Sequence, residues 1–548
     1  MSEIILQNIE KATIKQVFDR ACKVNSKHQL ICSPVKWPTN KKNCYTFEKV
    51  KNLSRLNSLH LLEKGLMIGD RVSIIIGNIP EFFIIKLALN CIGVSCVPIN
   101  AELSINEISY LIRHSNSRLI ITNKKYFNYL KKIEIIIKKK IGLALYSNNF
   151  LEFLIDIKPK HKIKLKKKIV SSTEASLLYT SGTTGKPKGC ILSHAYEINA
   201  GINYINKNGY ISLKKNKERI YNCLPVHHVN SGILSFYAAI LSGNCQIQSR
   251  KFSANSFWKE IKYSKATIFH YLGVMVSILI KKKHTKYERD NSLRLGVGAG
   301  IPPNLHKNFE TRFKVPMIEL WGMTEMVRCI FDNNKDREVG SRCIGKPKDI
   351  IETKVIDTNG KEIINQPGQL LIRYSKKNPK KYFFSGYYKD SKATAYAWRK
   401  NWFHTGDIVL KKNNGKLYFI DRNKNIIRRG GENISATEIE TILLLDKSVK
   451  NCAVISYPHK IYEEEVLSFI ILNEKVLPNL DTAKVLLNNA SKELAYFKLP
   501  GFIKFCNKLP LTSTQKIEKT KLFKSITNKN NDFLFDLSSY KKKMKFPN

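Results

Sequence analysis

The chain has 548 residues, and its 93 lysines and arginines outnumber its 44 aspartates and glutamates, which gives a formal net charge of +49. Hydrophobic residues make up 43% and aromatic residues 10%, so the composition supports a large core and excludes a disordered chain. With about 100–200 residues per domain, this length allows several folding units.

The positive charge is spread along the whole sequence. Lysines stand in short runs, for example at 138–140, 166–168 and 541–543. Isoleucine and asparagine are abundant beside them, and all three residue types have A/T-rich codons. We therefore interpret most of the charge as genome composition expressed on solvated faces. Specific nucleic-acid binding is not expected, although the field should attract polyanions.

The cysteines and the apolar segments indicate which cell compartment to expect and whether the chain spans a membrane. The 12 cysteines include no CxxC pair, which excludes zinc-ribbon spacing, and we expect them to be reduced in a cytoplasmic protein. The first residues, MSEIILQNIEKATIKQ, have no apolar signal region. The most apolar stretch, residues 82–99, carries Lys86 and Asn90 and is not expected to span a membrane.

The first regular elements alternate between strands and helices. Ser104 and Glu107 have the spacing of a capping box, which predicts a helix start. Such alternation is typical of a parallel sheet covered by helices. In chain order we expect a strand at 72–76, a helix at 80–91, a strand at 94–99, a helix at 104–114 and a strand at 119–122.

Further along the chain the pattern changes twice. Residues 124–168 are lysine-rich, and we interpret them as an irregular surface excursion. A second βα series follows from about 176 to 321, and short strands with turn signals then predict a small β-rich module. We therefore predict an α/β fold. Residues 1–420 would form a large domain of two βα-layered subdomains and a β-barrel-like module, and residues 421–548 a smaller α+β domain.

The sharpest motif is YTSGTTGKPKG at residues 179–189. Glycines let the backbone approach a phosphate closely, while hydroxyls, exposed N–H groups and lysine charge stabilise it. The spacing to the lysine is not that of a Walker A loop. The candidate phosphate-binding residues are Thr180, Ser181, Gly182, Thr183, Thr184, Gly185, Lys186 and Lys188.

This string resembles the phosphate loop of the adenylate-forming superfamily, which includes acyl-CoA synthetases, luciferases and stand-alone adenylation domains. Four further segments resemble the motifs of that family and stand in its order. They are ELWGMTE at 319–325, TGD at 405–407, DRNKNIIRRGGEN at 421–433 and LPLTSTQKI at 509–517. The resemblance covers roughly residues 45–525.

The resemblance implies a nucleotide site that binds Mg·ATP. Trp321 would lie along the adenine, where the family usually has Tyr, Thr324 would contact a phosphate, and Glu325 would hold Mg²⁺. Asp407 would accept hydrogen bonds from the ribose hydroxyls, and Arg422 would support the ribose or a phosphate. Small residues that would complete this site are Gly298, Ala299, Gly300 and Gly322.

The resemblance also implies a mobile C-terminal domain. Asp421 would be its hinge, and Gly430 and Gly431 would line the tunnel for the pantetheine arm of CoA. Lys516 would contact the carboxylate and the α-phosphate during adenylation. The residue before it is Gln515 where the family usually has Gly, so the loop that carries the lysine departs from the pattern.

The acyl end of the site is predicted from a likeness to the branch that contains crotonobetaine/carnitine–CoA ligases. His228 would be the motif histidine and His227 a gate, and either could instead be a core histidine. Tyr271, Gly273 and Met275 would line the acyl pocket, and an ordinary buried strand would explain them almost equally well.

The function that the resemblance implies is an ATP-dependent acyl-CoA ligase that activates a small carboxylic acid as acyl-AMP and transfers the acyl group to CoA. A stand-alone enzyme that loads an acidic carrier protein is a close alternative. A basic nucleic-acid-binding protein that kept the fold without catalysis is a distant one. The sequence does not decide between a monomer and a homodimer, and it does not identify the acid.

Overall fold

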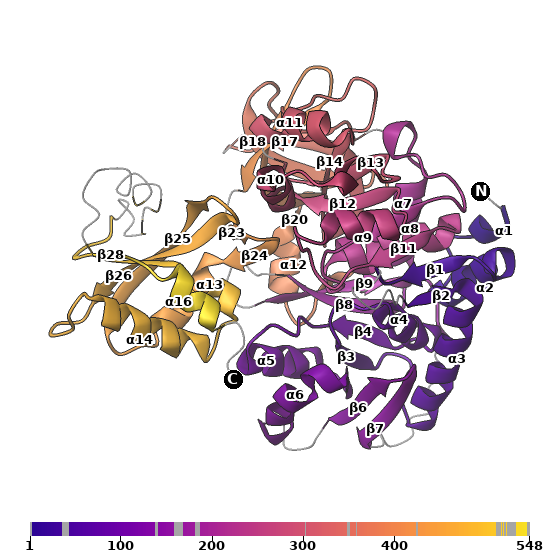
Figure 1. Ribbon diagram of the computed structural model, residues 1–548, viewed down its shortest axis with the longest axis horizontal. Helices are drawn as coiled ribbons and strands as arrows, with labels where there is room; N and C mark the ends of the chain where they lie inside the picture. The colour runs from indigo at the N-terminus through magenta and orange to yellow at the C-terminus, as the bar shows by residue number, and fades with distance from the viewer. Residues whose placement is uncertain are drawn as a thin grey trace. The chain divides into compact units, whose positions relative to one another are not determined.

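The computed structural model (Figure 1) describes residues 3–34, 43–136, 141–157, 168–180, 187–301, 303–347, 351–357, 359–422, 426–510, 517, 519, 522 and 533–544. They form two compact units. The first comprises Met1–Ala101, Ile112–Tyr179 and Gly189–Asp421, and the second comprises Glu102–Leu111, Thr180–Lys188 and Arg422–Asn548. Within the described ranges, no helix is both long enough and apolar enough to cross a membrane.

One eight-stranded sheet of the first unit has the strand order β19-β9-β8-β4-β3-β5-β6-β7. Its central pairs are parallel, and its strands and helices confirm the predicted alternation. The capping box is also present, because the Ser104 N–H donates to the Glu107 carboxylate at 2.9 Å. The strands are β3 (Arg71–Ile75), β4 (Ser95–Pro98), β5 (Leu119–Thr122), β6 (Gly142–Ser147), β7 (Phe150–Ile155), β8 (Glu174–Thr180), β9 (Lys188–Ser193) and β19 (Gly386–Tyr387). The helices before or between them in the sequence are α3 (Phe47–Glu63), α4 (Glu81–Cys91), α5 (Ile105–Ser115), α6 (Lys124–Ile136) and α7 (His194–Ile205), and the part of α5 up to Leu111 belongs to the second unit.

The prediction of an irregular excursion after residue 123 is wrong. That segment contains α6, β6 and β7. Lysines on the exposed face of α6 mask its apolar face, where Leu130 and Ile133 are buried. Strands β6 and β7 are joined by Asn148 and Asn149, both with positive φ (+50° and +70°), which suits a tight two-residue hairpin turn.

The second sheet of the first unit has the order β15-β14-β13-β12-β10-β11-β1-β2. Its six consecutive strands β14, β13, β12, β10, β11 and β1 run parallel, so their carboxyl ends meet at one edge. Strands β11 and β12 flank β10 on opposite sides, which makes the carboxyl ends of β10 and β12 the place where a crevice is expected. The elements are α1 (Glu3–Leu6), α2 (Ile14–Asn25), β1 (Gln29–Cys32), β2 (Cys44–Thr46), β10 (Arg219–Asn222), α8 (Phe236–Ser242), β11 (Cys245–Gln248), α9 (Phe257–Tyr263), β12 (Ile268–Leu272), α10 (Gly273–Lys281), β13 (Leu295–Ala299), α11 (Pro303–Phe313), β14 (Met317–Met323) and β15 (Met326–Phe331).

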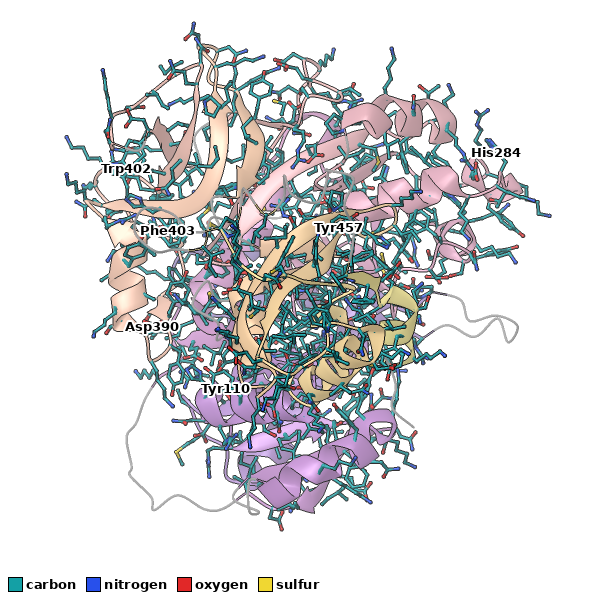
Figure 2. The ribbon with its side chains drawn as sticks, turned by 90° about the vertical axis from the view of Figure 1, so that its left-hand side faces the viewer. Tyr110, His284, Asp390, Trp402, Phe403 and Tyr457 are labelled. Atoms are coloured by element: carbon teal, nitrogen blue, oxygen red, sulfur yellow. A yellow bond between two sulfur atoms is a disulfide. The ribbon has the colours of Figure 1, made fainter. Side chains whose placement is uncertain are left out.

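The predicted β-rich module is an antiparallel sheet with the order β16-β22-β21-β18-β17, and β20 pairs with β21. Among the described residues this sheet runs from one edge to the other without closing into a barrel. Trp402 and Phe403, labelled in Figure 2, are neighbours on β21; Phe403 is buried in the core, while the Trp402 ring lies 4.1 Å from the guanidinium of Arg373. The elements are β16 (Cys343–Gly345), β17 (Glu352–Ile356), β18 (Pro367–Arg373), α12 (Ser391–Ala397), β20 (Trp398–Arg399), β21 (Trp402–Lys411) and β22 (Leu417–Arg422).

The second unit is an α+β arrangement around a sheet of order β24-β23-β26-β27-β28, in which β25 pairs with β26. A buried cluster of charges holds its C-terminal helix. Glu465 accepts from Arg429 at 2.6 Å and from Lys541 at 2.7 Å. Lys541 begins a lysine run that we expected to be solvated, yet it is fully buried. The elements are β23 (Ile426–Arg429), β24 (Glu432–Ser435), α13 (Ala436–Leu443), β25 (Val449–His459), β26 (Glu463–Leu472), α14 (Leu480–Ser491), β27 (Phe502–Phe505), β28 (Leu534–Asp536) and α16 (Ser538–Lys543).

A disulfide and a buried ion pair were not indicated by the sequence. Cys32 and Cys44 form a disulfide, so the prediction of uniformly reduced cysteines is wrong. They lie directly opposite each other on the antiparallel strands β1 and β2, a pairing that spacing along the chain does not indicate. Lys86, in the apolar helix α4, is only 2% exposed and donates to Glu197 at 2.8 Å, so the helix buries an ion pair.

Candidate active site

Two predicted site residues form the tip of the β14–β15 hairpin. Met323 pairs with Met326, and Thr324 and Glu325 make the turn between them. The Tyr196 hydroxyl donates to the Thr324 backbone carbonyl at 2.7 Å, and Tyr196 is fully buried. The turn is thus held from within the core, and its side chains stand at the end of a rigid element.

The carboxylate of Glu325 has a partner that the sequence did not indicate. The Tyr387 hydroxyl donates to Glu325 Oε1 at 2.7 Å, and the Phe384 N–H donates to the Glu325 backbone carbonyl at 2.9 Å. Burial and the nearby carboxylate raise the pKa of Tyr387 far above its ordinary value, so the phenol keeps its proton and remains a donor. Since Glu325 is 8% exposed, this bond orients a largely buried carboxylate.

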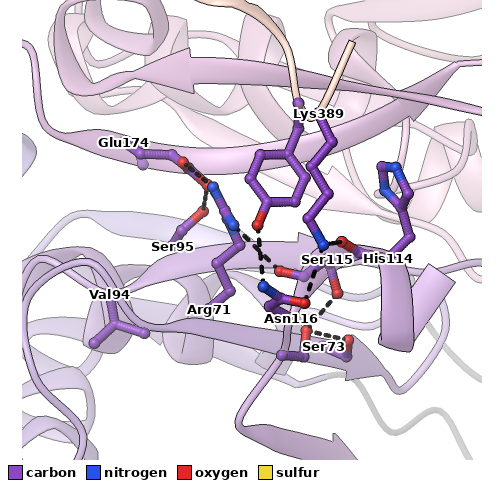
Figure 3. A network of polar contacts seen from close by, with 12 residues as sticks. Arg71, Ser73, Val94, Ser95, His114, Ser115, Asn116, Glu174 and Lys389 are labelled. Atoms are coloured by element: carbon purple, nitrogen blue, oxygen red, sulfur yellow. Dashed lines mark hydrogen bonds and ion pairs between the residues drawn. The ribbon is translucent and has the colours of Figure 1, made fainter.

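The segment that carries this tyrosine is fixed by a polar network (Figure 3). The Arg71 guanidinium lies 3.8 Å from the ring centroid of Tyr388 and makes two hydrogen bonds of 2.7 Å to Glu174. The Lys389 ammonium donates to the His114 backbone carbonyl at 3.2 Å. The two residues after Tyr387 are therefore anchored to β3, β8 and the end of α5, and this anchoring holds the phenol against Glu325.

Two other predicted residues meet although 86 positions separate them. Trp321 Nε1 donates to Asp407 Oδ2 at 2.9 Å. Both side chains are buried, with 5% of Trp321 and 2% of Asp407 exposed. The Thr405 hydroxyl accepts from the Asp407 N–H at 3.1 Å and donates to the Leu370 carbonyl at 2.7 Å, which fixes the backbone under the carboxylate. The structure thus brings the expected adenine and ribose residues into direct contact.

The small residues at the end of β13 allow very close packing. Gly298 lies in register with Tyr271 of β12, and a Cβ on it would stand 2.1 Å from the Tyr271 carbonyl oxygen. A Cβ on Gly273 would stand 1.7 Å from the Gly300 carbonyl oxygen. These glycines are therefore required by the close approach of β12, β13 and the start of α10, whether or not a nucleotide is bound.

Glu319 is a further residue that the sequence analysis did not select. Its carboxylate accepts the N–H groups of Gly300 at 3.1 Å and Ile301 at 2.7 Å, and so fixes the turn after β13. Burial raises its pKa to about 7, although the two backbone donors act in the opposite direction. Its position at the start of the ELWGMTE segment was the available signal.

The predicted histidines lie before an unusual helical turn. The ring centroids of His227 and His228 are 4.5 Å apart, and the His228 carbonyl accepts a hydrogen bond from the Gly232 N–H at 2.9 Å. A π-helical segment, Asn230–Ser235, follows them, and such segments recur at functional sites. The structure thus brings the two rings together at a turn.

A buried polar network lies beside this turn. His270 of β12 is fully buried, with Nδ1 at 2.8 Å from Asn230 Oδ1 and Nε2 at 3.1 Å from the Tyr204 hydroxyl. Burial lowers the pKa of His270 to about 3, so the ring is neutral at physiological pH. Asn222, at the end of β10, also donates to Asn230 Oδ1, at 3.1 Å. Polar side chains therefore gather at the carboxyl end of β10 and along the neighbouring β12, beside the place where a crevice is expected in this sheet.

Two predicted acyl-pocket residues have the contacts of core side chains. Tyr271 is fully buried and its hydroxyl donates to the Ile318 carbonyl at 3.2 Å. Met275 is 2% exposed, and its sulfur lies 3.8 Å from that of Cys223. These contacts are those of the buried-strand alternative.

The remaining predicted residues are placed only in part. Thr180 ends β8 and Lys188 begins β9, so both flank the phosphate loop. Gly430 and Gly431 form the turn between β23 and β24, with φ of +57° and +93°. Outside the described residues lie Ser181, Gly182, Thr183, Thr184, Gly185, Lys186, Gln515, Lys516 and the side chain of Arg422.

Comparison with known families identifies the class of this protein. The model of the AMP-binding enzymes matches residues 18–388, and the model of the AMP-binding enzyme C-terminal domain matches residues 438–516. The chain therefore belongs to the AMP-binding enzyme family, and the resemblance to adenylate-forming enzymes is confirmed.

Individual relatives refine this likeness. The chain is 28% identical over 476 residues to crotonobetaine/carnitine–CoA ligase of Citrobacter koseri, covering 84% of this chain and 89% of the relative. The corresponding ligase of Proteus mirabilis is 28% identical over 475 residues, with the same coverage. The fold is similar to o-succinylbenzoate CoA synthetase from Bacillus subtilis (TM-score 0.77, 20% identity, 92% of this chain and 97% of that chain). It is also similar to an amide bond synthetase from Marinactinospora thermotolerans (TM-score 0.75, 18% identity, 93% and 99%).

Proposed function

We propose that this protein is an AMP-forming acid–thiol ligase that activates a carboxylic acid with ATP and transfers the acyl group to CoA. In the first half-reaction a carboxylate oxygen attacks the α-phosphorus of ATP, and the bond to the leaving pyrophosphate breaks, giving acyl-AMP. In the second, the CoA sulfur attacks the acyl carbon, its proton is lost and AMP leaves. Neither step needs a covalent enzyme intermediate.

The observation that carries this proposal is the contact between Trp321 and Asp407, two motif residues far apart in the sequence. A ring face suits a purine, and a carboxylate suits vicinal hydroxyls. Their 2.9 Å hydrogen bond supports an assignment in which one local site receives the adenine and the ribose together. Binding at such a site would position ATP for attack, and positioning with electrostatic stabilisation is a major source of rate enhancement.

The residues present also suit the Mg²⁺ that accompanies ATP. Glu325 supplies a hard carboxylate oxygen, and ligating carboxylates are commonly oriented by a hydrogen-bond donor, a role that Tyr387 can fill here. The ion would neutralise phosphate charge when bound. Thr324, beside Glu325 at the hairpin tip, offers a hydroxyl to the same phosphates, and Lys516 and the phosphate loop would stabilise the charge that develops during attack.

We further propose that the two half-reactions use two orientations of the C-terminal domain, with Asp421 as the hinge. This is supported by the position of Asp421 as the last residue of the first compact unit. Gly430 and Gly431 make a tight turn without side chains, which suits the edge of a narrow pantetheine tunnel. Hinge closure that exchanges one face of a domain for another is a known use of such boundaries.

The experiment is AMP release from ATP over a panel of short, medium, branched, aromatic and betaine-type acids, each with and without CoA. AMP release that needs both an acid and CoA supports the proposal and names the substrate class. Acid-dependent exchange of pyrophosphate without CoA turnover would instead favour a carrier protein as acceptor, which the net charge of +49 would suit if the carrier is acidic. If neither AMP release nor pyrophosphate exchange occurs with any acid, the proposal is contradicted.

A further inference from the structure

The indole of Trp321 does more than offer a ring face. Its N–H is committed to Asp407 Oδ2 at 2.9 Å, inside the core, where 2% of the aspartate is exposed. A hydrogen bond to an ionised acceptor is among the stronger ones in proteins, and it is stronger still where water is excluded. The orientation of this carboxylate is therefore tied to the position of the indole.

We propose that Trp321 is a positioning residue for ribose recognition: its N–H holds Asp407 so that the carboxylate faces the ribose hydroxyls while the same ring lies along the base. The inference rests on the proposed nucleotide site. It makes recognition of the base and of the sugar interdependent, because movement of the ring moves the donor that orients the carboxylate.

Phenylalanine at this position separates the two roles. Trp321→Phe keeps an aromatic face and deletes the N–H. The carboxylate of Asp407 then loses a partner whose bond is worth at least tenfold in an equilibrium, and its plane is no longer set from the β14 side. The expected effect is therefore on discrimination among sugars, beyond any effect on base binding.

A matched control is available in Trp258, which is also 5% exposed and stacks on Phe313 with ring centroids 4.6 Å apart. Trp258→Phe removes a buried indole of the same exposure from α9, where it packs against Phe313 of α11, and Trp258 is not one of the proposed nucleotide-site residues. Any general cost of converting a buried tryptophan to phenylalanine will be seen in both variants.

The experiment measures the Kd of AMP, 2′-deoxy-AMP and 3′-deoxy-AMP by calorimetry on the full chain, together with ATP-dependent turnover and the melting temperature. We expect Trp321→Phe to weaken AMP binding about tenfold and the deoxy nucleotides much less, so that the ratio between them collapses. Trp258→Phe should preserve the wild-type ratio.

The outcomes separate this inference from the proposed function. An unchanged AMP to deoxy-AMP ratio in Trp321→Phe, even with a lowered melting temperature, would show a structural role only and overturn the inference. A collapsed ratio in a protein that turns over no acid would uphold the inference and overturn the ligase proposal. A wild-type chain that binds none of the three nucleotides would overturn both.

Discussion

Tyr387→Phe removes one hydroxyl and with it the 2.7 Å hydrogen bond to Glu325 Oε1. The remaining ring keeps its contact with Phe384, whose centroid is 4.8 Å away, so the core around it should be retained. A hydrogen bond to a charged group contributes about 1.5–3 kcal/mol. Loss of a group that orients a metal ligand typically weakens metal binding about 10–100-fold.

The low end of that range is the smallest effect expected, because Glu325 is only 8% exposed and water can replace little of the lost bond. We expect the Mg²⁺ concentration for half-maximal AMP release to rise at least about tenfold at saturating ATP and acid. The assay is a Mg²⁺ titration of AMP release, with the melting temperature measured on the same samples.

Tyr382→Phe is the control for this variant. Tyr382 also donates to a carboxylate at 2.7 Å, that of the exposed Glu10, which is not one of the proposed site residues. It should leave the Mg²⁺ dependence unchanged. An unaltered Mg²⁺ titration in Tyr387→Phe would refute the view that this phenol orients a metal ligand, and equal shifts in both variants would point to a general effect of losing a phenol.

Three further predictions concern stability. Lys86→Met should lower the free energy of unfolding by about 3–5 kcal/mol in urea titrations, because Glu197 would be left buried without its cation. The double change Lys86→Met/Glu197→Leu should recover most of this loss. A double variant no more stable than the single variant would contradict the prediction. The folded pKa of Glu319 is raised from 4.5 to about 7, so the folded state holds this proton more tightly and stability should fall by up to about 3 kcal/mol as pH rises from about 4.5 to 7. Glu319→Gln should remove that slope in urea titrations at pH 5 and pH 7.5, and a slope equal to that of the wild type would count against the assignment. Glu465→Gln should destabilise the second unit by about 3 kcal/mol, because two buried cations lose their shared carboxylate. The measurement is the rate of proteolysis in the region after Asp421, which should rise. An unchanged digestion rate would argue that the cluster is not stabilising.

The local sequence was enough where one element carries its own signal. Strand β5 was predicted at its full extent, and the capping box of Ser104 and Glu107 placed the start of α5. These signals can be read from a short stretch of sequence, because periodicity and capping depend on residues only a few positions apart. Segment α6 to β7 was missed because the lysines on its solvent face mask the apolar residues that it buries.

In the candidate site, the sequence likewise identified individual residues but not their partners in space. Short motifs named Trp321, Glu325 and Asp407 because each lies in a distinctive string, and the order of the strings indicated the family. The partner of Glu325 could not be named, because Tyr387 lies 62 positions away and only the pairing of β19 with β9 brings it close.

By itself, the sequence determined the family, the α/β class and the chemical types of the site residues, since these depend on residue identity and on short spacing. Tertiary structure alone decided which of those residues touch. It turned Trp321 toward Asp407, buried Lys541 beside Glu465 and paired Cys32 with Cys44. Each of these contacts depends on the order of strands in a sheet or on the docking of a distant helix. Strand order and helix docking are not encoded in any single stretch of the chain.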